Sequence, residues 1–198
     1  MRIKRIIGGN LESNGFIIFQ KEGGDCYIID PGYNGEAYLK KVKDLSLRLK
    51  GILLTHHHYD HVGGVQKIKN ATDCPVSIHR CDSDLLKFQA DIHLEDGEKL
   101  FLEEEEIQVI HTPGHTMGSV CFYSEKSKLV FTGDTIFNVD LGRTDLVDGD
   151  QQAMESSIVN IINEWGNDMT IYPGHGDSCN MKFVRKNNRE FLDIVTPR

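Results

Sequence analysis

Short apolar runs alternate with glycine- and asparagine-rich turns over the first thirty residues, a pattern typical of strands joined by tight connections. Strands are predicted at residues 2–7, 16–20 and 26–30. Residues 35–49 carry apolar side chains at a helical spacing and predict an amphipathic helix. The chain then continues with an apolar strand at 51–55, a helix at 63–70, a strand at 75–79 and a helix at 82–90.

The second half repeats this order of elements. Strands are predicted at 107–111, 119–123 and 128–132, then a helix at 151–164 and a strand at 169–172. The acidic run at 103–106 indicates a solvated turn. Because strands, helix and strand occur twice, we expect an α/β fold of two similar halves, a four-layer αββα sandwich with its turns gathered at one edge. At 198 residues the chain (1–198) is expected to form a single domain.

Composition narrows the classes of partner. The net charge of −8 argues against a basic nucleic-acid-binding surface. Neither a signal peptide nor an uninterrupted apolar stretch of about 18 residues is present, so no membrane partner is expected. Five cysteines without a C-x-x-C pair fit free thiols in a reducing cytoplasm. We therefore expect a cytoplasmic monomer or homodimer that acts on a small molecule.

Candidate chemistry is concentrated in residues 55–61, which read Thr-His-His-His-Tyr-Asp-His. Side chains alternate at the end of a strand, so His56 and His58 share a face and His57 points away. Imidazoles combined with a carboxylate suit zinc or a similar first-row metal, whereas calcium and magnesium prefer oxygen ligands.

Similar side chains recur downstream in turns of small residues. His115 and His175 each follow a Pro-Gly pair, and Asp134 ends the apolar strand-like run 129–133. Glycine and proline allow a sharp turn, which can bring each side chain to a shared point. The sequence therefore predicts a metal site assembled from several strand ends.

These residues resemble the metallo-β-lactamase superfamily, specifically its glyoxalase II-like (hydroxyacylglutathione hydrolase-like) enzymes. The resemblance is carried by Asp30, the 55–61 run, His115, Asp134 and His175. It implies a first metal held by His56, His58 and His115, and a second held by Asp60, His61 and His175. Asp134 would bridge the two metals. Asp30 would support a ligand from behind, or alternatively cap the turn before Pro31.

The resemblance implies a metal-dependent hydrolase of small acyl thioesters or related esters. Its cofactors would be two divalent transition-metal ions, zinc first, with iron or manganese as alternatives. Asp60 would orient the attacking water and carry its proton. The lactamases of the superfamily usually have cysteine at the position of Asp134, which disfavours antibiotic hydrolysis.

Several alternatives stay open at this stage. A mononuclear iron persulfide dioxygenase would use the same ligands, and a lactone or phosphodiester hydrolase shares the fold. Arg143 would hold a substrate carboxylate or instead pair with Asp145. Full-length glyoxalase II enzymes continue into a helical glutathione-binding segment, while this chain ends 23 residues after His175, which puts glutathione in doubt as the carrier. Four further histidines match no ligand position and are expected to be structural or exposed: His57, His79, His93 and His111.

Overall fold

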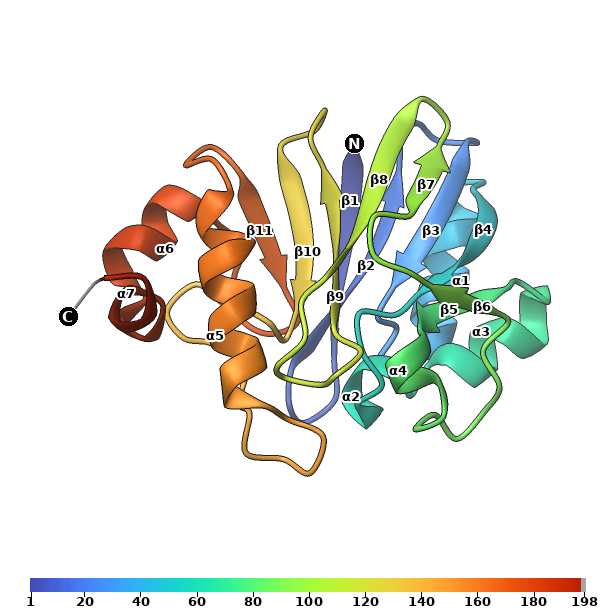
Figure 1. Cartoon of the computed structure of the whole chain (residues 1–198). Helices are drawn as coiled ribbons and strands as arrows, with labels where there is room; N and C mark the ends of the chain where they lie inside the picture. Colours follow the sequence, from blue (N-terminus) through green and yellow to red (C-terminus); the bar gives the residue numbers. More distant parts are fainter. Residues whose placement is uncertain (197–198) are drawn as a thin grey trace.

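A computed structural model describes residues 1–196 and contains two six-stranded sheets (Figure 1). In spatial order, the first sheet consists of β1 (Arg2–Gly8), β2 (Ser13–Phe19), β3 (Asp25–Ile29), β4 (Arg48–Leu53), β5 (Val76–His79) and β6 (Ile92–Leu94). The second consists of β12 (Cys179–Asn180), β11 (Thr170–Pro173), β10 (Leu129–Gly133), β9 (Val120–Ser124), β8 (Glu105–His111) and β7 (Lys99–Leu102). Each sheet comes from one half of the chain, β1 to β6 from the first and β7 to β12 from the second, and this confirms the expected two halves.

Helices cover the outer face of each sheet (Figure 1). The first half contributes α1 (Gly35–Asp44), α2 (Tyr59–Val62), α3 (Val65–Thr72) and α4 (Arg80–Ser83). The second half contributes α5 (Gln151–Asn160), a 3-10 turn (Ile162–Glu164), α6 (Met181–Asn187) and α7 (Arg189–Val195). The architecture is the four-layer αββα sandwich that the repeated element order predicted.

Strand β2 shows how the layers are held together. Ile17 and Phe19 pack outward against α1 and α3, whereas Phe16 and Ile18 point inward to the second sheet. The ring of Phe16 lies 5.0 Å from that of Phe131 in the opposite sheet. Because successive strand side chains point to opposite faces, one fully buried strand supplies two cores.

Two predicted helices differ from the structure. The helix expected over 35–49 ends with α1 at Asp44, because Ser46 adopts a left-handed φ of 53° and the chain enters β4 at Arg48. The helix expected over 82–90 is wrong beyond the short α4. Leu86 and Phe88 both pack against the first core at a spacing of two residues, which a helix does not allow.

Two smaller corrections concern the second half. The helix expected over 151–164 stops after α5 and continues as the 3-10 turn. In the acidic run 103–106, Glu105 is not solvated: it is 2% exposed in β8 and accepts hydrogen bonds from Ser124 and Gln20. The pattern did not predict β6, β7, β12, α6 or α7.

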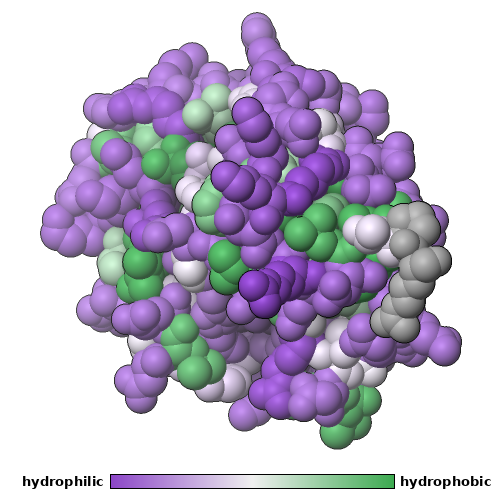
Figure 2. Space-filling view, turned by 90° about the vertical axis from the view of Figure 1, so that its left-hand side faces the viewer, coloured by the Kyte–Doolittle hydropathy of each residue, from purple (hydrophilic) through white to green (hydrophobic). Residues whose placement is uncertain are grey.

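The surface over α5, α6 and α7 is mainly hydrophilic, with apolar side chains in separate patches (Figure 2). Val159 and Phe183 are among the exposed apolar residues of these helices, each 42% exposed. Within residues 1–196, no helix has the length and apolar character that crossing a membrane requires.

Candidate metal centre

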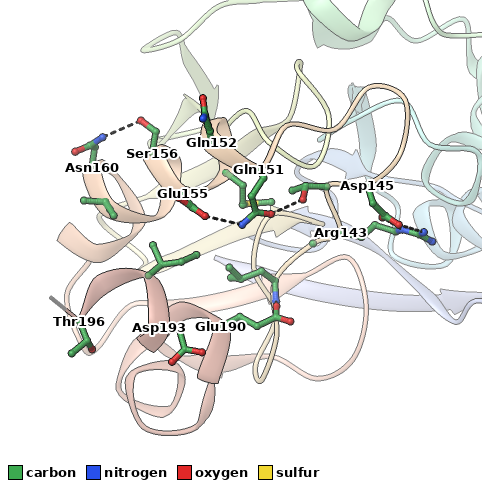
Figure 3. Close-up of a pocket in the computed structure, with 16 residues that line it drawn as sticks. Arg143, Asp145, Gln151, Gln152, Glu155, Ser156, Asn160, Glu190, Asp193 and Thr196 are labelled. Carbon is green, nitrogen blue, oxygen red and sulfur yellow. Dashed lines mark hydrogen bonds and ion pairs between the residues drawn. The ribbon is translucent and has the colours of Figure 1, made fainter. Parts of the chain in front are cut away.

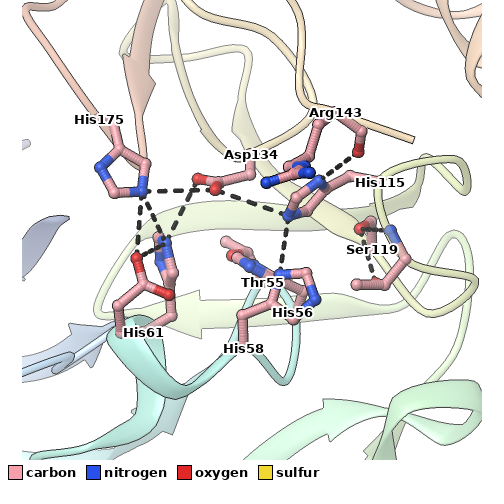
Figure 4. Close-up of polar contacts among 12 residues, drawn as sticks. Thr55, His56, His58, His61, His115, Ser119, Asp134, Arg143 and His175 are labelled. Atoms are coloured by element: carbon pink, nitrogen blue, oxygen red, sulfur yellow. Dashed lines mark hydrogen bonds and ion pairs between the residues drawn. The ribbon is translucent and has the colours of Figure 1, made fainter. Parts of the chain in front are cut away.

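The sequence-predicted ligands come together at one edge of the two sheets (Figure 4). The segment between β4 and α3, including α2, supplies four of them: His56, His58, Asp60 and His61. The other three follow strands of the second sheet: His115 after β8, Asp134 after β10 and His175 after β11. Turns distant in sequence therefore meet where the sheet edges meet.

The first group of donors consists of His56, His58 and His115. One ring nitrogen from each lies within 4.8 Å of the others. Nδ1 of His58 lies 2.9 Å from Nε2 of His115, and the ring of His56 is 4.9 Å from that of His115. Converging imidazole nitrogens of this kind are suited to a first-row metal ion.

The second group consists of Asp60, His61 and His175, again with donor atoms within 4.8 Å of one another. Nε2 of His175 lies 3.2 Å from Oδ2 of Asp60. Asp134 lies between the two groups. Its Oδ1 is 3.3 Å from Nε2 of His61, and its Oδ2 is 3.4 Å from Nε2 of His175 and 3.6 Å from Nε2 of His115.

An oxygen holds the outer ring nitrogen of four of these histidines. Nδ1 of His56 lies 3.0 Å from Oγ1 of Thr55, and Nδ1 of His61 lies 3.2 Å from Oδ2 of Asp30. Nδ1 of His115 lies 2.8 Å from the carbonyl oxygen of Arg143, and Nδ1 of His175 lies 3.0 Å from that of Leu11. Carbonyl and carboxylate oxygens only accept, so the Nδ1 atoms opposite them donate. This leaves Nε2 as the ring nitrogen that can bind a metal ion, as is usual for metal-binding histidines.

Asp30 supports both groups from behind. It has a left-handed φ of 46° and is 2% exposed. Its Oδ1 accepts from the backbone N–H of Thr55 at 2.8 Å, and its Oδ2 accepts from Thr55 Oγ1 at 2.5 Å. The same carboxylate faces His61, while Thr55 faces His56, so one aspartate orients a histidine of each group.

Charge is divided across the centre. Burial, together with the neighbouring His115 and His57, lowers the pKa of His58 to about 4. Burial alone would lower the pKa of His175, but the carboxylates of Asp134 and Asp60 raise it to about 9. For Asp134, burial alone would raise the pKa, but His61 and His175 hold it well below its ordinary value. Without a metal, protons on His175 supply positive charge between the carboxylates.

Two observations show that a metal fits this centre. Nε2 of His56 and Oδ1 of Asp134 are buried and have no hydrogen-bond partner within residues 1–196, although buried polar atoms are normally satisfied. Gly174 leaves the centre open, because a Cβ there would lie 2.1 Å from Oδ1 of Asp134. The His and Asp cluster is therefore able to bind metal ions.

Other sequence candidates lie around this cluster. Arg143 forms a bidentate ion pair with Asp145. Its Nε and one terminal nitrogen donate to the two carboxylate oxygens, at 2.7 and 2.9 Å. Cys179 lies in β12 and packs against the core under α5 to α7. Three of the remaining histidines have local contacts: His79 stacks on His111, and His93 contacts Ser83.

Sequence reasoning missed Asp82 and Asp148. Asp82 is fully buried, and its Oδ2 accepts from Nδ1 of His57 at 2.9 Å. Asp148, in the segment between β10 and α5, places Oδ2 3.0 Å from Nε2 of His57. No local pattern in the sequence marks either aspartate, because each acts on a histidine at least 25 residues away.

A groove of about 1180 Å³ begins at Arg143 (Figure 3). The carbonyl of Arg143 also holds His115 of the metal centre. The groove runs between the 141–151 segment, α5 and α7. Its charged lining consists of Arg143, Asp145, Glu155, Glu190 and Asp193. The groove could hold the part of a ligand that extends away from the donor atoms.

Comparisons with known proteins agree with this fold. Residues 8–175 match the model of the metallo-beta-lactamase superfamily. The hydroxyacylglutathione hydrolase GloC of Haemophilus influenzae is 32% identical over 180 residues, covering 81% of this chain and 84% of that protein. An uncharacterized protein of Aquifex aeolicus is 32% identical over 193 residues, covering 89% and 90%.

Solved structures give the same answer. The BLEG-1 B3 metallo-beta-lactamase superposes with a TM-score of 0.90 at 28% identity, over 99% of this chain and 100% of that one. A di-iron-bound form of TTHA1623 superposes with a TM-score of 0.84 at 31% identity, over 93% and 98%. The chain belongs to the metallo-beta-lactamase superfamily. Within it, the chain is a metal-dependent hydrolase.

Proposed function

We propose that this protein hydrolyses small acyl thioesters with the help of two zinc ions. His56, His58 and His115 would hold the first ion, Asp60, His61 and His175 the second, and Asp134 both. The observation that carries the proposal is the place of Asp134, whose two oxygens lie 3.3 to 3.6 Å from histidine nitrogens of both groups. When bound, such ions lower the pKa of water to roughly 7 and polarise a carbonyl oxygen.

The residues of the chain would prepare this centre and move the proton. Asp60 is 6% exposed and held 3.2 Å from His175, so its carboxylate is fixed at the rim of the centre. There it can orient the attacking water and accept its proton. Asp30 and the carbonyls of Arg143 and Leu11 fix the histidine rings, so little reorganisation is needed during reaction.

The thioester preference rests on the relatives and on the groove. GloC is named a hydroxyacylglutathione hydrolase and shares 32% identity with this chain. The groove at Arg143 offers one guanidinium and several carboxylates, which suits a carrier thiol with both an ammonium and a carboxylate. Arg143 would take the substrate carboxylate after separating from Asp145. The site is proposed to act in the cytoplasm on a small acyl substrate.

Iron is the alternative metal, and one structural neighbour supports it. The TTHA1623 structure is described as di-iron-bound, so iron stays a candidate for this centre. With iron, a persulfide dioxygenase would use one ion held by His115, Asp134 and either His56 or His58. The two functions differ in metal, in oxygen consumption and in substrate, so a single set of measurements separates them.

The test is metal analysis coupled to activity on the protein as purified. We expect two zinc ions per chain and hydrolysis of S-lactoylglutathione, which is measured through the free thiol that it releases. The panel also contains a lactone, a phosphodiester and a β-lactam, because BLEG-1 is named a metallo-beta-lactamase. One iron per chain with oxygen uptake on glutathione persulfide would contradict the proposal, as would a zinc-loaded enzyme that ignores every thioester.

A further inference from the structure

His57 is a third histidine of the metal motif, and it is built like the ligands beside it. Its Nδ1 lies 2.9 Å from Oδ2 of Asp82, a fully buried carboxylate that can only accept. Nδ1 therefore donates, and Asp82 fixes the ring as Asp30 fixes His61. A carboxylate behind a histidine is the usual support of a metal-binding imidazole.

The other ring nitrogen of His57 faces a second carboxylate. Nε2 lies 3.0 Å from Oδ2 of Asp148, and Nε2 of His58 lies 3.6 Å from the same oxygen. This oxygen is buried, yet it has no hydrogen-bond partner within the described part of the chain. Oδ2 of Asp148 is thus a buried ligand atom without a partner, close to the ring nitrogen of His57 that Asp82 leaves free.

Nε2 of His57 and Oδ2 of Asp148 lie 3.0 Å apart, but they are not aligned as a hydrogen bond. Two donors about 3 Å apart, with neither aimed at the other, are instead spaced like two ligands of one metal ion, given metal–ligand distances of about 2 Å. The main centre shows the same signature at Asp134 Oδ1.

We propose that His57, His58 and Asp148 form an accessory site for a divalent metal ion next to the main centre. One donor atom from each lies within 4.8 Å of the others. Two imidazoles and one carboxylate suit zinc, with water completing the coordination. The site is reachable, because the side chains of His57, His58 and Asp148 are 13, 18 and 20% exposed.

His58 would belong to both sites. Its Nδ1 faces His115 in the first group, while its Nε2 faces Asp148. Binding at both nitrogens requires that the ring lose its remaining proton to solvent, so the accessory ion displaces one proton and His58 becomes a bridging imidazolate. The ion would also tie the 141–151 segment, and with it one wall of the groove, to the metal motif.

The test is a zinc titration of the two-zinc protein, followed by equilibrium dialysis and metal analysis. Wild type is expected to bind a third ion more weakly than the first two. Asp148→Ala should lose the third ion while keeping two, with a rise in its dissociation constant of more than about 10–100-fold, since even loss of an outer partner costs that much. Asp145→Asn is the matched control: it removes an exposed carboxylate from the same segment and should keep three ions.

Each other outcome decides against the site. Saturation of wild type at two ions overturns it, as does a third ion that survives in Asp148→Ala or disappears in Asp145→Asn. If Asp148→Ala only weakens the first two ions, Asp148 is a hydrogen-bonding support and the accessory site is wrong. If wild type binds fewer than two ions, the paired-zinc function fails, and the accessory site is still judged by the difference between wild type and Asp148→Ala.

Discussion

Oδ2 of Asp30 lies 3.2 Å from Nδ1 of His61 and accepts at 2.5 Å from the hydroxyl of Thr55, which in turn faces Nδ1 of His56. One buried carboxylate therefore sets the ring orientation of a histidine in each donor group. Because the left-handed φ of Asp30 suits asparagine as well, the charge can be removed without disturbing the backbone.

Asp30→Asn is expected to weaken zinc binding by about 10–100-fold while the fold is retained. Competition with a chromogenic chelator measures the affinity. Asp73→Asn is a matched control, since Asp73 has a similar φ of 53° but lies exposed at the end of α3. Equal losses in both variants would show that the effect does not pass through His61 and Thr55.

Asp134→Ala should abolish hydrolysis and reduce occupancy of both zinc positions, because its two oxygens face both groups. Metal analysis after gel filtration gives the occupancy, and circular dichroism checks the fold. A variant that still retains two zinc ions would contradict the bridging role. His57→Ala, by contrast, should keep two ions.

The metal-free protein should be most stable to unfolding near pH 6.5, the ordinary histidine pKa. Below pH 6.5, His58 binds a proton in the unfolded chain but not in the folded protein, where its pKa is about 4. Stability therefore falls as the pH decreases toward 4. Above pH 6.5, the folded protein still holds the proton of His175, whose pKa is about 9, and this advantage is lost as pH rises to 9.

Urea midpoints of chelator-treated protein across this range test the sign on each side. Burial lowers the pKa of His56, which adds to the loss of stability below pH 6.5. The carboxylates around His61 raise its pKa despite burial, which adds to the loss of stability above pH 6.5. Zinc should remove the alkaline decline, because the ions replace these protons. A midpoint that climbs steadily from pH 6.5 to 9 without zinc would show that His175 and His61 are not held as cations.

Arg143→Ala should lower kcat/KM for a carboxylate-bearing thioester by roughly ten- to a hundredfold, since a charged bidentate contact is worth about 1.5–3 kcal/mol. Asp145→Ala is the informative partner variant. If Asp145 only competes for Arg143, its loss leaves the efficiency unchanged or raises it. Equal losses in the two variants would instead indicate that the pair holds the 141–151 segment in place.

The sequence predicted the fold, and the residues expected as donors do lie close together, because both expectations rest on local signals. The apolar strands alternate or run continuously, and His115, Asp134 and His175 each stand in a short turn of small residues. The supports of these side chains were not predictable in the same way. Leu11 holds His175 from 164 positions away through a backbone carbonyl, which leaves no trace in residue type.

The helix expected over 82–90 failed for a related reason. Leu86 and Phe88 both pack against the core of the first sheet, so tertiary packing sets the path of the chain after α4. Local helical preference cannot foresee such contacts. The second-half helices α6 and α7 went unpredicted because no expectation extended past His175.

The edge at which the donors meet has a consequence for the chain as a whole. His56, His58, Asp60 and His61 come from the first half, and His115, Asp134 and His175 from the second. Each donor group takes members from both. Neither of the two donor groups is complete within one half, so coordination by either group requires the two sheets to have closed on each other. An ion bound here would stabilise the contact between the two halves, and its removal would weaken that contact before it weakened either sheet.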